Sequence, residues 1–172
     1  MKTPIIMLVL MVTPFVIARI WSLFTRCEVD LRTTAAVGLT ALFIFTGVGH
    51  LIQTEPMSQM LPPWVPERVL LVYLTGVLEF TIAAGFVIRR SRQLTGRVAA
   101  TILVVFFPAN IYAALNQIPM GGHEWGPVYL LIRVPLQLAI LLWVYWFTIK
   151  QPNFALNPDT PQVGSARPPS AG

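Results

Sequence analysis

Residues 69–88 read VLLVYLTGVLEFTIAAGFVI, an apolar run in which Glu79 carries the only formal charge. An α-helix needs about 20 apolar residues to cross the hydrocarbon core of a bilayer, and this run has that length. It lacks the polar and apolar alternation of the much shorter strands of a membrane β-barrel. We therefore predict a transmembrane helix with an acid near its centre.

Four other segments have the same character and fit the window of ~17–25 residues that a membrane-spanning helix requires. They are residues 4–24, 33–52, 98–115 and 127–149. The first is interrupted only by Arg19 and could alternatively be a secretory signal peptide. Its basic start is weak and no Ala-x-Ala site follows it, so we expect a retained helix. The predicted fold is an all-α polytopic membrane helix bundle with five spans.

The composition agrees with this fold. Of the 172 residues, 55% are hydrophobic and only 11% are charged, against about 25% charged residues in a soluble domain. The net charge of +5 does not indicate nucleic-acid binding, because the basic residues lie in short breaks between apolar runs. Cys27 is the only cysteine, which excludes an intramolecular disulfide, a CxxC redox pair and a cysteine metal cage.

The basic residues also predict an orientation. Arg89, Arg90, Arg92 and Arg97 cluster between the third and fourth segments, and such a cluster marks a cytoplasmic loop. Alternation of five spans then places the C-terminus inside and the N-terminus outside. The proline-rich tail over residues 150–172 is expected to be disordered and cytoplasmic.

Ionisable and amide side chains within these segments are the candidate functional residues, because polar groups are costly in hydrocarbon and commonly functional. With a helical rise of about 1.5 Å per residue, they fall between the membrane midplane and the outer leaflet. We predict a ligand-binding cluster formed by His50, Glu79, Asn110, Arg133 and Gln137.

Each candidate also has a structural interpretation that stays open. Glu79 could be a neutral, hydrogen-bonded acid, or it could form a buried pair with Arg133. Arg133 could extend to the interface, and His50 could be a packing residue. The side chain of Asn110 could repair the helix break that Pro108 introduces. No second metal ligand stands at suitable spacing beside His50, so no metal site is predicted.

The loop over residues 55–66, EPMSQMLPPWVP, is too short and too rich in proline for a domain. It is apolar enough to lie on the membrane surface. It either caps the outer mouth of the bundle or is a plain interfacial connector.

From residue 33 to residue 149 the chain resembles the DoxX family of small bacterial membrane proteins. The phrases that carry the resemblance are FTGVGH at 45–50, MLPPWVP at 60–66, VYLTGVLE at 72–79, FPANIY at 107–112 and RVPLQ at 133–137. The resemblance implies a four-helix DoxX-like membrane domain over 33–149 in a bacterial inner membrane. The helix within residues 1–25 is then an addition, and the tail is unmatched.

The family's namesake is linked to a thiosulfate:quinone oxidoreductase, and other members are associated with redox homeostasis. The leading hypothesis is therefore a membrane subunit or accessory protein that binds a small lipophilic molecule such as a quinone and works with a redox partner protein. The single cysteine weakens any sulfur-transfer role. The rival hypothesis is a structural or assembly protein, with or without oligomerisation. A small transporter has little support, since no inverted repeat is visible.

Overall fold

The computed structural model describes residues 2–25 and 29–150, and every regular element within these ranges is helical. The elements are α1 (Lys2–Thr25), α2 (Leu31–Ile52), α3 (Thr54–Gln59), α4 (Arg68–Val87), α5 (Arg92–Val105), α6 (Phe107–Leu115), the 3-10 helix η1 (His123–Tyr129), α7 (Leu130–Val144) and the π-helical turn η2 (Tyr145–Ile149). The predicted tail, apart from Lys150, and Cys27 lie outside the described residues.

Five helical stretches are long and apolar enough to cross a membrane. They are Thr3–Thr25, Leu31–Ile52, Arg68–Val87, Arg92–Leu115 and His123–Ile149. This confirms the predicted all-α fold, and the five long apolar helices fit the predicted multi-pass membrane protein. The fourth stretch begins at Arg92 rather than at residue 98, because long arginine side chains let a polar first turn join a helix at the membrane interface. The fifth stretch begins with η1 at His123, whereas the sequence predicted a segment that starts only at residue 127.

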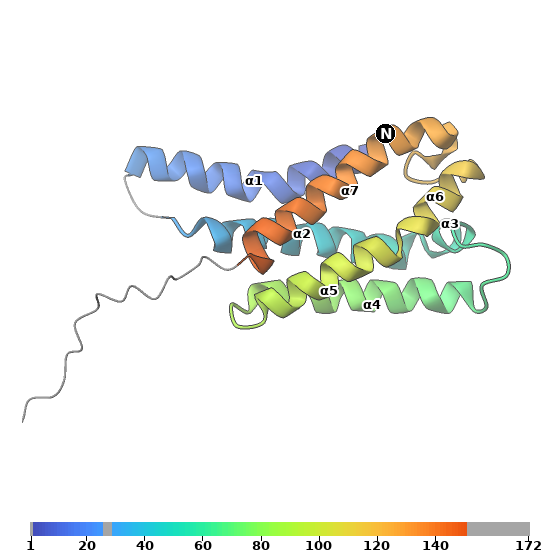
Figure 1. Cartoon of the computed structure of the whole chain (residues 1–172), viewed down its shortest axis with the longest axis horizontal. Helices are drawn as coiled ribbons and strands as arrows, with labels where there is room; N and C mark the ends of the chain where they lie inside the picture. The colour runs from blue at the N-terminus through green and yellow to red at the C-terminus, as the bar shows by residue number, and fades with distance from the viewer. Residues whose placement is uncertain (1, 26–28, 151–172) are drawn as a thin grey trace, which may run out of the picture.

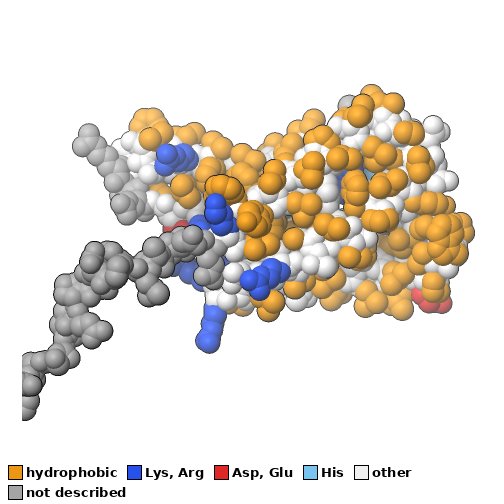
Figure 2. Space-filling model, viewed as in Figure 1, with side chains coloured by type: hydrophobic (Ala, Val, Ile, Leu, Met, Phe, Trp, Pro, Cys, Tyr) orange, Lys and Arg blue, Asp and Glu red, His pale blue; other side chains and the backbone are white. Residues whose placement is uncertain are grey.

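The spans run in alternating directions, so the bundle has two distinct ends (Figure 1). One end, which we call the basic end, holds the first turns of α2 and α5 and the last turn before Lys150. The opposite end, the loop end, holds α3 and η1. Figure 2 shows the Lys and Arg side chains gathered toward the basic end, while apolar side chains cover most of the visible face.

The interior is packed from all five spans. The α2 helix lies against α1 and α4, and α5 contacts α4, α7 and η2. The core residues are Met7, Met11, Leu39, Leu42, Phe43, Ile82, Ala83, Phe86, Ala99, Leu136, Ile140 and Val144. Large apolar side chains also face outward; Leu131 is 76% exposed and Leu74 is 55% exposed. An apolar surface this extensive is suited to contact with lipid chains.

The fourth span is broken between α5 and α6. Pro108 lies in the first turn of α6 and has no N–H to donate to the preceding turn. Two side-chain amides donate to backbone carbonyls beside the break. Gln137 Nε2 of α7 donates to Leu103 O at 2.6 Å, and Asn110 Nδ2 donates to Phe106 O at 3.1 Å. Such bonds supply backbone carbonyls near a helix break with donors where hydrocarbon offers no water.

Asp30 caps the first turn of α2 at the basic end. Its carboxylate accepts hydrogen bonds from the backbone N–H groups of Arg32 and Thr33 and from the Thr33 hydroxyl. The Thr33 hydroxyl bond is the main reason why the pKa of Asp30 is lowered from its ordinary value. Arg89, whose Nη2 lies 3.4 Å from Asp30 Oδ2, adds to this effect and links the loop after α4 to the start of α2.

Candidate functional site

A cavity of about 530 Å³ lies toward the loop end, among α1, α2, α4, α6, η1 and α7. Its wall is mostly apolar, with methionine, leucine, isoleucine and phenylalanine side chains. All five predicted site residues line it, namely His50, Glu79, Asn110, Arg133 and Gln137. The fold thus brings together polar residues from four different helices, although their role in ligand binding stays a prediction.

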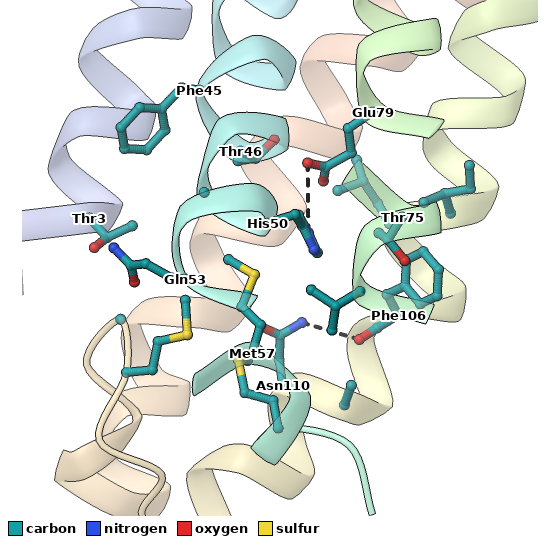
Figure 3. A pocket seen from close by; sticks show the side chains of 18 of the residues that line it. Thr3, Phe45, Thr46, His50, Gln53, Met57, Thr75, Glu79, Phe106 and Asn110 are labelled. Atoms are coloured by element: carbon teal, nitrogen blue, oxygen red, sulfur yellow. Dashed lines mark hydrogen bonds and ion pairs between the residues drawn. The ribbon is translucent and has the colours of Figure 1, made fainter. Parts of the chain in front are cut away.

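His50 and Glu79 face each other across the contact between α2 and α4 (Figure 3). His50 Nε2 lies 3.7 Å from Glu79 Oε2, which is an electrostatic contact but too long for a hydrogen bond. Both groups are largely buried, and neither His50 Nδ1 nor Glu79 Oε2 has a hydrogen-bond partner among the described residues. Both residues of the pair belong to the cavity wall.

Gly76 makes the approach of these two helices possible. A Cβ atom at position 76 would lie 2.9 Å from His50 Cβ and 3.4 Å from the carbonyl oxygen of Gly47. Real Cβ atoms are essentially never found as close as the first of these distances. The glycine therefore lets α4 approach α2 closely enough to bring Glu79 and His50 together.

Arg133 points into the bundle rather than out to the interface. Its Nη1 lies 3.8 Å from Met7 Sδ of α1, and its Nε is buried with no hydrogen-bond partner among the described residues. The pair with Glu79, one of the alternatives left open by the sequence, is not a direct ion pair in the described part of the chain. A guanidinium is always charged, so the cavity wall contains a cation that touches no carboxylate of the residues described.

Asn110 and Gln137 line the cavity but direct their amide nitrogens elsewhere. Each donates to a carbonyl beside the break between α5 and α6. For Asn110 the acceptor is the Phe106 carbonyl, whereas the carbonyl that loses its helical donor to Pro108 is that of Val104, four residues earlier. Gln137 is buried, at 6% exposed, and ties α7 to the end of α5. One amide N–H of each residue is thus engaged with the backbone, while His50, Glu79 and Arg133 each have a buried polar atom without a hydrogen-bond partner among the described residues.

His123 was not predicted as a site residue, yet it lines the same cavity and is only 4% exposed. Its Nε2 has no hydrogen-bond partner among the described residues. Hydropathy places His123 in a short polar loop, where a histidine is usually solvated. The available signal was weak: an ionisable residue directly after the pair Gly121 and Gly122, just before an apolar segment.

The loop after α2 closes part of the cavity. Met57 of α3, and Met60 and Leu61 just after it, belong to the cavity wall, so this loop caps the bundle at the loop end. Trp64 farther along is 78% exposed and packs edge-on against Tyr112 of α6. The capping interpretation of this loop agrees with its position. In the described ranges, no group of three or more His, Cys, Asp or Glu side chains is placed to hold a metal ion.

Comparisons with known proteins gave one match, to a sequence family. A search of curated proteins found no match. A search of solved structures found none either. The family match spans residues 39–148, from the middle of α2 to η2, and so leaves α1 outside. Because this match covers well over half of the sequence, the chain belongs to the family described as a domain of unknown function (DUF8561).

Proposed function

We propose that this membrane protein binds a small lipophilic molecule, in the first instance a quinone, in the cavity at the loop end. The observation that carries the proposal is the cavity itself. Its volume of about 530 Å³ falls within the ~300–1,000 Å³ of typical small-molecule sites, and it has the usual combination of apolar walls and few polar groups. The resemblance to the DoxX family, with its links to quinone chemistry, supports the same ligand class.

The unpartnered polar atoms suggest roles for three residues. Arg133 has only donors to offer and would hydrogen-bond a carbonyl oxygen of the ligand. Glu79 would accept or relay a proton, and His50, whose Nε2 lies 3.7 Å from Glu79 Oε2, is its immediate neighbour. Asn110 and Gln137 would shape the wall and hold α6 and α7 in place. Under this proposal the protein is a subunit or accessory of a redox-linked system in a bacterial inner membrane.

Mass spectrometry of lipophilic molecules that copurify with the gently solubilised protein tests this function. We expect wild-type protein to retain a quinone and the variants Glu79→Gln and Arg133→Met to lose it. Glu55→Gln is the matched control, because Glu55 is exposed and lies outside the cavity wall. Equal retention by wild type and both cavity variants, or no retained lipophile in any of them, would refute the proposal.

The competing function is a structural or assembly role in which the polar residues only fix helix packing. The bonds that Gln137 and Asn110 make to carbonyls beside the helix break favour it. Under this alternative, substitutions at Glu79 and Arg133 lower the stability of the bundle without a separable loss of a ligand.

A further inference from the structure

The guanidinium of Arg133 has hydrogen-bond donors that the described part of the chain leaves unused. Its Nη1 contacts Met7 Sδ at 3.8 Å, and a thioether sulfur is only a weak acceptor. Its Nε is buried without a partner among the described residues. Its Nη2 makes no hydrogen bond to these residues either but, unlike Nε, keeps accessible surface. Part of the guanidinium can therefore be reached by another molecule.

This guanidinium lies at the cavity. Arg133 is near the start of α7, and the beginning of α1 lies beside that part of α7 (Figure 1). Arg133 and its contact Met7 both line the cavity. A molecule that occupies the cavity can therefore bond the guanidinium, and only the weak Nη1 contact to Met7 competes with it.

No acid among the described residues pairs with this cation. Glu79, the one acidic side chain in the cavity wall, lies against His50, with Oε2 3.7 Å from His50 Nε2. Neither ion pair in the described ranges includes Arg133. A buried charge is costly unless an opposite charge with good hydrogen-bond geometry accompanies it. Carboxylate and phosphate oxygens match the planar fork of a guanidinium, so a ligand that brings such a group would supply the missing partner.

The rest of the wall suits an apolar chain, and the cavity adjoins the surface that faces lipid. Leu71 and Leu74 of α4 line the cavity and are also 39% and 55% exposed. Phe106, between α5 and α6, lines it too and is 36% exposed. Side chains that belong to both the cavity and the outer surface let a molecule dissolved in the bilayer place its chain along them while its head group lies inside.

From these contacts we propose that the cavity binds an amphiphile with an anionic head group, a carboxylate or a phosphate, which pairs with Arg133 while its chain lies along the apolar wall. This inference rests on the proposed function, because it concerns the same cavity. It narrows the ligand from lipophilic molecules in general to lipophilic anions. The two head groups share one chemistry, a negatively charged set of oxygen atoms, and the experiment separates them.

The test uses the full chain in nanodiscs of phosphatidylcholine, a lipid without net charge, at about pH 8, where carboxylates and phosphates are ordinarily ionised. Dodecanoate, dodecyl phosphate and dodecanol have the same chain length and differ in the head group. Binding of each is measured against nanodiscs without protein, which corrects for partition into lipid. We expect at least one of the two anions to bind about tenfold or more tightly than the alcohol. The anion that does so identifies the head group.

Two substitutions of Arg133 locate the preference for the anion. Arg133→Met should remove it while the affinity for dodecanol stays within a few-fold, and Arg133→Lys, which keeps the charge without the fork, should retain part of it. Arg97→Met is the matched control, because Arg97 is exposed at the basic end and lies outside the cavity wall. It should leave the affinities unchanged.

A second measurement needs no variant and so does not depend on how well the variants fold. Dodecanoate with a photoreactive diazirine beside its carboxylate is bound to wild-type protein and activated by light, and the labelled residues are found by mass spectrometry. We expect labelling near Met7 and Arg133 that excess dodecanoate suppresses. Labelling confined to residues 89–97 would show that the anion binds the basic end and would overturn the inference.

Two further outcomes separate this inference from the proposed function. Equal affinities of wild-type protein for both anions and the alcohol, or an anion preference that survives in Arg133→Met, would refute the role of Arg133 and leave the binding of lipophilic molecules in the cavity standing. If folded wild-type protein binds none of the three compounds and retains no quinone, the proposed function fails as well.

Discussion

His50 Nε2 of α2 lies 3.7 Å from Glu79 Oε2 of α4, and the two side chains are 19% and 13% exposed. This contact joins two candidate residues on the packed helices α2 and α4, and it depends on the absence of a side chain at Gly76. The distance between His50 and Glu79 therefore depends on how closely α4 packs against α2.

Gly76→Ala is expected to separate these helices. The added methyl group would clash with His50 Cβ, and overpacking of this kind typically costs about 1–3 kcal/mol. Thermal unfolding in detergent should show a lower midpoint than wild type. Gly49→Ala is the matched control, because its Cβ would meet only the flexible end of Met57 at 3.4 Å. An equal effect of the two substitutions would contradict the role assigned to Gly76.

Gln137→Leu should destabilise the bundle more than Asn110→Leu does. Gln137 is buried and donates to Leu103 O at 2.6 Å. Asn110 is only partly buried and donates to the backbone of Phe106, a residue that is 36% exposed. Truncating Gln137 removes the more buried of the two donors, and a buried polar group left unsatisfied costs about 1–3 kcal/mol. Chemical denaturation of the two variants in the same detergent measures the two losses in free energy of unfolding. A larger loss for Asn110→Leu would show that the Gln137 bond is not the more stabilising of the two.

Arg133→Met separates the ligand-binding and structural functions. The wild-type guanidinium has no carboxylate in contact within the described residues, so its burial is poorly compensated. We expect the variant to be as stable as wild type, or more stable, while losing the copurifying ligand. Measuring the unfolding midpoint and the ligand content of the same samples distinguishes a ligand-binding role of Arg133 from a structural one. A variant that is clearly less stable, with ligand loss proportional to unfolding, would favour the structural role.

Asp30 should give the basic end a stability that depends on pH. Because its pKa is lower in the folded protein than its ordinary value, its contribution is fully present above the ordinary range of aspartate and is lost as the pH falls through the folded pKa. Unfolding midpoints of wild type should therefore fall below about pH 4. Asp30→Ala should remove part of this dependence and cost about 1 kcal/mol at neutral pH. Identical acid profiles would rule out Asp30 as a contributor.

The basic end is expected to face the cytoplasm. It carries Arg89, Arg90, Arg92 and Arg97, and positively charged loops are retained on that side. A reporter fused after Lys150 should be active if it requires the cytoplasm and inactive if it requires the periplasm, and a fusion within residues 60–66 should behave in the opposite way. Replacing the four arginines with glutamine is expected to weaken this asymmetry.

The sequence alone determined that the chain forms several membrane-spanning helices, and it located the break near Pro108. These features depend on local quantities: the transfer free energy of consecutive side chains and the missing N–H of one residue. For the same reason it identified Glu79, Arg133 and Gln137 as polar residues that a helix carries into hydrocarbon.

Only the tertiary structure decided which of these groups meet. Partners depend on how each helix is rotated about its axis and on how closely neighbours approach, and both result from packing over the whole bundle. Glu79 therefore contacts His50, while the ion pair with Arg133, one of the alternatives that the sequence left open, is not formed among the described residues, and Gln137 bonds a backbone carbonyl. His123 was missed because a histidine in a polar loop carries no hydropathy signal; its burial arises from the fold of η1 against Tyr129 and the cavity wall.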